Sequence, residues 1–71
     1  MKITIGGTAN NGMIEVRVTY YEQVDGLGQS GDVLVWVPDH DSRAEIKKSA
    51  RIAAAAFLTR ALQAHSSPDP A

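Results

Sequence analysis

The chain has 71 residues, which is enough for one domain and too few for two. Its seven Lys and Arg nearly balance its eight Asp and Glu, which argues against a nucleic-acid binder of the usual basic kind. Cysteine is absent, which favours a cytoplasmic location, and no apolar run is long enough for a signal peptide or a membrane span.

The first predicted element is a β-hairpin. Asn11-Gly12 suits a two-residue type I′ turn, because both central residues of that turn need a positive φ. Gly6 and Gly7 are candidates for a bulge or a bend in the first strand. Centring the turn on Asn11-Gly12 places all bulky apolar residues on one face, with these partners: Asn10 and Met13, Ala9 and Ile14, Gly7 and Val16, Ile5 and Val18, Ile3 and Tyr20.

A loop and a third strand follow the hairpin. Residues 22–32 are rich in glycine and polar side chains, which predicts a mobile loop. Residues 33–37 are apolar at every position and predict a strand that Pro38 ends.

A helix is predicted from about residue 42 to residue 64. Ser42 and Glu45 have the spacing of a capping box, in which Ser42 accepts from the backbone and Glu45 reaches back. Helical periodicity gathers a stripe of mostly small residues that should lie close on the sheet: Ile46, Ala50, Ala53, Ala54, Phe57, Ala61 and Ala64. The domain is thus expected over residues 1–65, with a frayed tail over residues 66–71.

These elements predict an α+β fold, with a three-stranded antiparallel sheet (β-β-β-α) and one C-terminal helix packed on one face. One helix can cover only one face of such a sheet. An apolar surplus therefore remains, and we expect it to form a homodimer or partner interface through Leu34, Trp36, Leu58 and Leu62.

Two motifs are considered for chemistry and interpreted otherwise. Residues 26–31 match G-x-G-x-x-G, but a strand follows them, whereas dinucleotide binding needs a helix there. The run Asp39-His40-Asp41 and the distant His65 do not converge as metal ligands, and helix capping explains the acids. We therefore predict no catalytic residue, no metal and no cofactor, and no enzyme activity.

Charge is distributed unevenly along the chain. Residues 15–45 hold seven acidic and two basic side chains, whereas residues 46–65 hold four basic side chains and no acidic one. Acidic strands and loops suit a basic partner surface. The predicted partner-binding acids are Glu15, Glu22, Asp25 and Asp32.

Residues 47–55, Lys-Lys-Ser-Ala-Arg-Ile-Ala-Ala-Ala, resemble the last helix of the double-stranded RNA-binding domain, which three strands also precede. The resemblance implies phosphate contacts by Lys47, Lys48 and Arg51. The family's first helix is missing here, Ser42 to Ile46 precede the lysines, and the loops are acidic. A solvated basic face on an alanine-rich helix is the other interpretation.

In size, acidity and lack of cysteine the chain also resembles the anti-CRISPR proteins of phages and mobile elements. That resemblance implies an inhibitor that acts by stoichiometric contact with a larger protein target, such as a nucleic-acid-processing complex. An RNA-binding module of double-stranded RNA-binding type and a structural homodimeric subunit are the alternatives. Membrane binding is not expected.

Overall fold

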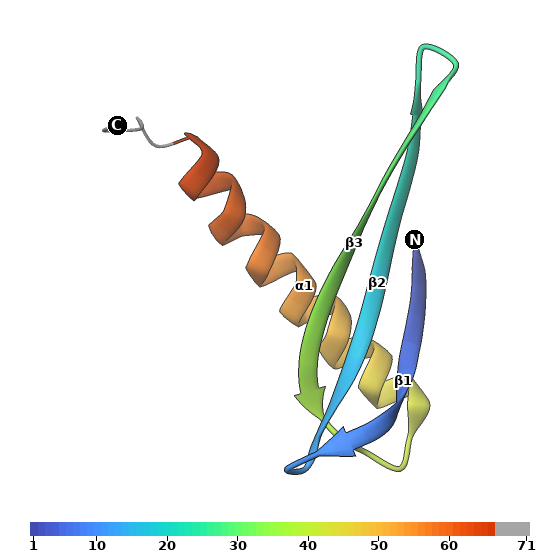
Figure 1. Cartoon of the computed structure of the whole chain (residues 1–71), viewed down its shortest axis with the longest axis vertical. Coiled ribbons are helices and arrows are strands. Elements are labelled where there is room, and N and C mark those ends of the chain that lie inside the picture. The colour runs from blue at the N-terminus through green and yellow to red at the C-terminus, as the bar shows by residue number, and fades with distance from the viewer. Residues whose placement is uncertain (67–71) are drawn as a thin grey trace.

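Three strands and one helix make up the computed structural model, which describes residues 1–66 (Figure 1). The strands β1 (Lys2–Asn10), β2 (Met13–Val24) and β3 (Leu27–Pro38) form an antiparallel sheet in the order β1-β2-β3, and α1 (Arg43–Ser66) follows. The predicted α+β class, with an antiparallel sheet and one C-terminal helix, is confirmed. Of the predicted tail, Ser66 is the last residue of α1, and residues 67–71 lie outside the described residues.

The first hairpin turns at Asn11 and Gly12, whose φ angles of 54° and 75° confirm the predicted turn. On the N-terminal side of Ala9 the predicted register is wrong, because β1 has an irregularity between Ile5 and Ala9. Ile5 lies opposite Val16 instead of Val18, and Ile3 lies opposite Val18 instead of Tyr20. A shift of two residues keeps Ile3 and Ile5 on their predicted face, since side chains alternate with a period of two. The irregularity divides β1 into two pairing segments and falls at the two glycines.

The second hairpin corrects the prediction of a mobile loop over residues 22–32. β2 continues to Val24, β3 begins at Leu27, and the two-residue turn between them has positive φ at Asp25 and Gly26. Residues 20–31, which we call the distal hairpin, extend past Lys2, the first residue of β1, which lies opposite Thr19 (Figure 1). The motif over residues 26–31 thus lies in a turn and a strand, without the helix that phosphate binding requires.

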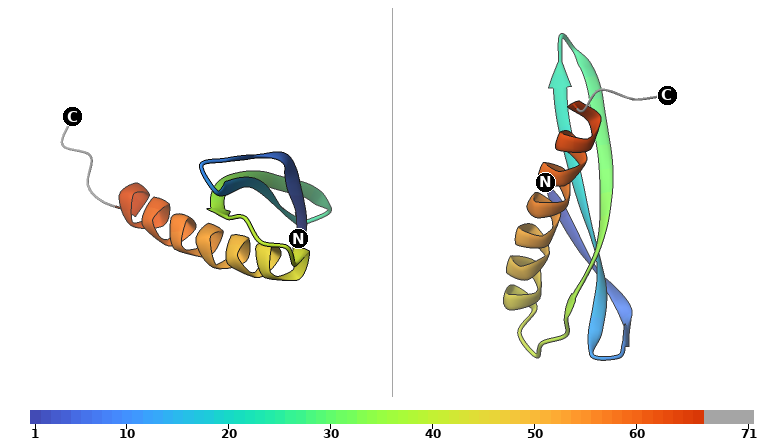
Figure 2. Two further views of the ribbon diagram at one scale, coloured as in Figure 1. Left: turned by 90° about the horizontal axis from the view of Figure 1, so that it is seen from below. Right: turned by 90° about the vertical axis from the view of Figure 1, so that its left-hand side faces the viewer.

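The core lies between α1 and one face of the sheet. β2 and β3 supply alternate residues to it, and α1 supplies mainly alanine, which lets the helix lie close to the strands. The buried residues are Ile14, Val16, Val18, Val33, Val35, Val37, Ile46, Ala50 and Ala54. The predicted stripe holds only as far as Ala54, because Phe57, Ala61 and Ala64 are exposed. Figure 2 shows why: α1 crosses the sheet at an angle and leaves it.

The segment before α1 is held by a chain of short-range hydrogen bonds. The backbone N–H of His40 donates to the Asp39 carboxylate, and the backbone N–H of Ser42 donates to Nδ1 of His40, both at 2.9 Å. The Glu45 N–H donates to Oγ of Ser42 at 3.4 Å, so Ser42 caps the helix through a long hydrogen bond. The predicted return bond from Glu45 is replaced, because His40 accepts from the Ser42 N–H instead.

Candidate binding surface

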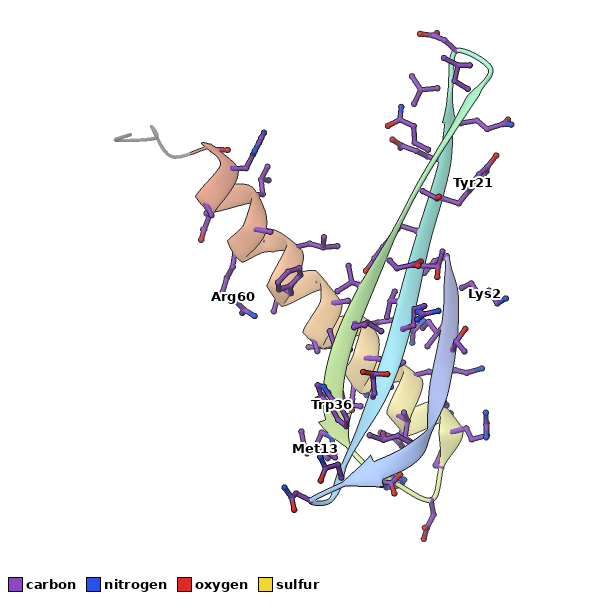
Figure 3. The ribbon with its side chains drawn as sticks, in the orientation of Figure 1. Lys2, Met13, Tyr21, Trp36 and Arg60 are labelled. Carbon is purple, nitrogen blue, oxygen red and sulfur yellow. The ribbon has the colours of Figure 1, made fainter. Side chains whose placement is uncertain are left out.

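The face of the sheet turned away from α1, which we call the open face, carries an apolar strip with charges beside it. On β3, Leu34 is 53% exposed and Trp36 is 49% exposed. Across the strand pair, Trp36 lies opposite Glu15 and Leu34 lies opposite Arg17. Figure 3 shows Trp36 on the lower part of β3. In the same view the helix passes behind the sheet. The alternation that buries the three valines of β3 forces these two large side chains outward.

The open face is hollowed beside the glycines of β1. One open hollow of about 450 Å³ is lined by Gly6, Gly7, Ala9, Asn10, Glu15 and Trp36. A smaller one of about 180 Å³ shares Gly6 and Glu15 with it and adds Thr4, Arg17 and Leu34. The missing side chain at Gly7 leaves open space in the hollow that the Trp36 indole lines, and the half-buried Glu15 lines the same hollow. An aromatic ring next to a carboxylate can bind a Lys or Arg side chain, through a cation–π contact with the ring and a charge-assisted hydrogen bond to the carboxylate.

Four of the predicted site residues meet on the open face: Glu15, Asp32, Leu34 and Trp36. Asp32 is held in place, because Oγ1 of Thr19 donates a 2.8 Å hydrogen bond to its carboxylate. Arg17, which is exposed on the same face, was not among the predicted site residues. Its position opposite Leu34 could have been found only from the correct pairing of β2 with β3.

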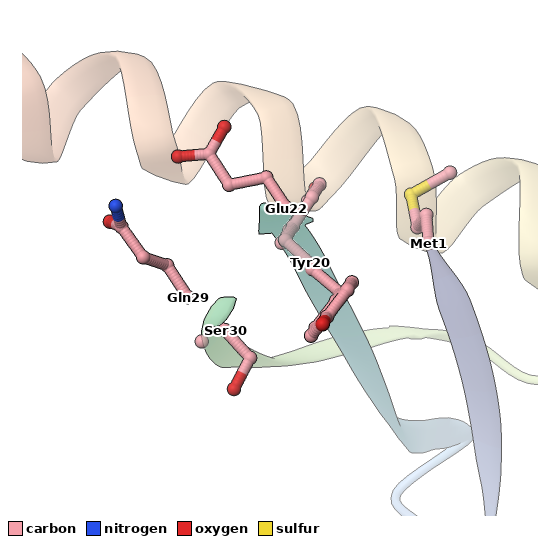
Figure 4. A pocket seen from close by; sticks show the side chains of 7 residues that line it. Met1, Tyr20, Glu22, Gln29 and Ser30 are labelled. Carbon is pink, nitrogen blue, oxygen red and sulfur yellow. The ribbon is translucent and has the colours of Figure 1, made fainter. Parts of the chain in front are cut away.

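The remaining acidic candidates lie away from this face. Asp25 is in the turn of the distal hairpin, and Glu22 lies on the helix side of the sheet. Glu22 lines an open hollow of about 410 Å³ near the start of β1, together with Met1, Tyr20, Tyr21, Gln29, Ser30 and Gly31 (Figure 4). The structure thus distributes the four predicted acids over three places instead of one.

The candidates on α1 form two further groups. Leu58 and Leu62 are 39% and 65% exposed, on the part of the helix beyond the sheet. Leu34 and Trp36 lie on the face of the sheet turned away from α1, so the predicted apolar surplus is two surfaces and not one. Lys47, Lys48 and Arg51 are exposed on the half of α1 that packs on the sheet.

Within residues 1–66, no group of three or more His, Cys, Asp or Glu side chains is placed to hold a metal ion. Asp39 and His40 instead form the turn before α1 through the hydrogen bonds given above. In the same part of the chain, α1 does not combine the length and apolar content that a membrane span requires.

Comparison of the chain with protein-family models, with curated proteins and with solved structures found no match.

Proposed function

We propose that this chain is a non-catalytic binding protein that contacts a larger, partly basic protein through the open face of its sheet. The observation that carries the proposal is the exposure of Trp36 and Leu34 of β3 on that face, beside Glu15 and Arg17 of β2. Tryptophan and arginine are the side chains most enriched among residues that dominate binding energy. Charged groups around an apolar centre give the polar rim of a protein interface.

Inhibition is the activity that such contact would produce. A small acidic chain that occupies a basic surface can keep nucleic acid from that surface, as in the phage inhibitors that the chain resembles. The excess of acidic side chains over residues 15–45 supports a basic partner, because opposite charges speed association. A cytoplasmic nucleic-acid-processing complex is the class of partner that we propose.

The test is affinity capture on the immobilised full chain from a cytoplasmic extract, followed by binding of the purified captured protein. We expect one protein retained at a fixed molar ratio. Trp36→Ala should weaken its binding by roughly 30-fold or more, because truncation of an aromatic anchor that dominates an interface costs about 2 kcal/mol or more. The matched control is Ile52→Ala, an exposed apolar side chain on α1.

Two results would count against the proposal. Retention of nothing at a stoichiometric level would remove the binding function. Equal binding by the wild type, Trp36→Ala and Leu34→Ala would show that the partner uses another face. Sedimentation of each variant beforehand separates a change in oligomeric state from a change in binding.

RNA binding is the second candidate, favoured by the joint exposure of Lys47, Lys48 and Arg51 on one half of α1. Any affinity for duplex RNA should be weak and depend on these cations, because phosphate contacts by clustered Lys and Arg dominate such binding. A triple alanine variant should abolish the gel shift seen at low salt, whereas Arg60→Ala should leave most of it. Tight binding that survives the triple substitution would show that the cluster has no role.

A further inference from the structure

The second half of α1 extends past the sheet. No residue from Ala55 to Ser66, which we call the helix overhang, is buried, although the core-facing stripe continues through Phe57, Ala61 and Ala64. At 1.5 Å per residue the overhang is about 18 Å long. Figures 1 and 2 show it leaving the sheet on the side of β3, so its core-facing side looks toward the space beside that strand. Phe57 remains 48% exposed there.

The strand at that border is itself unpaired on one side. β3 is twelve residues long and is hydrogen-bonded only to β2 within the described sheet. In a hairpin closed by a two-residue turn, every second pair counted from the turn directs its backbone groups away from the partner strand. The backbone groups of Ser30, Asp32 and Leu34 therefore point to the free edge. Such a long edge is a template for another strand.

We propose that a second copy of this chain pairs its β3 antiparallel with this β3, which makes one continuous sheet across a twofold axis. Each helix overhang then lies under the partner's half of the sheet. An added strand beside β3 would lie directly over Phe57, Ala61 and Ala64, which face the position it would take.

A second copy fits because each copy has both an uncovered stretch of sheet and an unpacked length of helix, so that two copies can cover each other. The helix side of the distal hairpin carries Val24 and Leu27, which are 42% and 71% exposed and are not covered by the copy's own helix. Antiparallel pairing would bring the partner's overhang to this uncovered stretch. A twofold axis satisfies both copies with one contact, which is the self-complementarity that a symmetric dimer needs.

The side chains on the flank of the overhang suit contact between the two helices. Figure 3 shows Arg60 on the lower side of the overhang, pointing away from the distal hairpin. Leu58 and Leu62 lie two residues from Arg60 in either direction, which places them about 160° around the helix from it. They therefore lie on the side of the helix that faces the distal hairpin, where the partner's helix would pass.

Charge complementarity also favours a second copy. The distal hairpin has Glu22 and Asp25 and no basic side chain, whereas α1 from Ile46 onward has basic side chains and no acidic one. Reciprocal packing brings the acidic hairpin of each copy toward the basic helix of the other.

Sedimentation velocity of the full chain at micromolar concentration tests the proposal. We expect a dimer, and we expect Leu62→Glu to weaken dimerisation by roughly 100-fold or more, since the unpaired carboxylate is buried once in each copy. Ile52→Glu is the matched control, because Ile52 is exposed, precedes the overhang and lies about 160° around the helix from the buried Ala50 and Ala54, and it should remain dimeric. Circular dichroism of both variants checks that each keeps its fold.

Single cysteines locate the contact, because the chain has no cysteine of its own. Ser30→Cys, Asp32→Cys and Leu34→Cys should include one position that forms an intermolecular disulfide efficiently on mild oxidation, with the yield falling at the others. Lys2→Cys, on the opposite edge of the sheet, should not. A monomer at every concentration, a dimer unaffected by Leu62→Glu, or disulfides at Lys2→Cys alone would each overturn the proposal. None of these measurements involves the partner proposed above.

Discussion

Ala50→Leu should lower the free energy of unfolding by about 2–3 kcal/mol, the upper part of the range for overpacking a close-packed core. Ala50 is fully buried between α1 and the sheet, and the short distance between these layers depends on alanine at this position and at Ala54. A domain of this size has only about 3–5 kcal/mol of stability from its core. Most of it would be lost, so the urea midpoint should fall steeply.

The control for this substitution is Ala55→Leu, five residues further along and exposed. Leucine and alanine have similar helix propensity, so the change should stay within about 0.5 kcal/mol. Urea unfolding of both variants, followed by circular dichroism, compares them directly. Equal losses would show that Ala50 does not pack against the sheet as described.

Gly6→Ala should destabilise the fold by about 1–3 kcal/mol, because the new methyl group has no space. A Cβ at Gly6 would lie 2.8 Å from the backbone carbonyl oxygen of Glu15, a contact that no side-chain rotation can relieve. The two strands would have to move apart at the irregularity of β1. The hollow beside Trp36 would change shape as well.

Gly7→Ala is the control for Gly6→Ala. A Cβ at Gly7 meets no atom within 4 Å, so the only change is the lower entropy of the unfolded chain. That change should stabilise the fold by about 0.4–1 kcal/mol. If Gly7→Ala destabilised the fold more than Gly6→Ala did, the described irregularity of β1 would be wrong.

The sequence predicts the sheet face of each residue in the first hairpin better than it predicts their partners. Asn11-Gly12 determines the pairing near the turn, and alternation determines which side chains face the core. The register beyond Ala9 could not be read from these signals. A glycine indicates that a strand could be irregular at that position, but it does not indicate how many residues the irregularity contains.

The predicted loop over residues 22–32 is wrong because the second strand of the distal hairpin is rich in glycine, which local propensity assigns to loops. Asp25-Gly26 is itself a type I′ turn signal, which the surrounding polar residues obscured. Continuous pairing from Met13 to Pro38 imposes the strand conformation there despite weak local propensity. The Tyr21 ring covers Gly28, with its hydroxyl 3.0 Å from the place a Cβ would occupy.

The presence of exposed apolar side chains could be predicted from the number of apolar faces on the sheet and the helix, but the arrangement of these side chains could not. A strand apolar on both faces and a single helix imply exposed side chains, and Leu34, Trp36, Leu58 and Leu62 are indeed exposed. Their separation into two surfaces depends on the crossing angle of α1 and on its length relative to the sheet. Neither quantity is encoded in a local pattern.

The most direct test of the proposed binding function is acrylamide quenching of Trp36, the only tryptophan of the chain. In the free protein the indole is about half exposed and should be readily quenched. Titration with the captured partner should reduce quenching, move the emission to shorter wavelength, and saturate at the molar ratio of the complex. Formation of the complex with quenching of Trp36 unchanged would contradict the assignment of the open face as the binding surface.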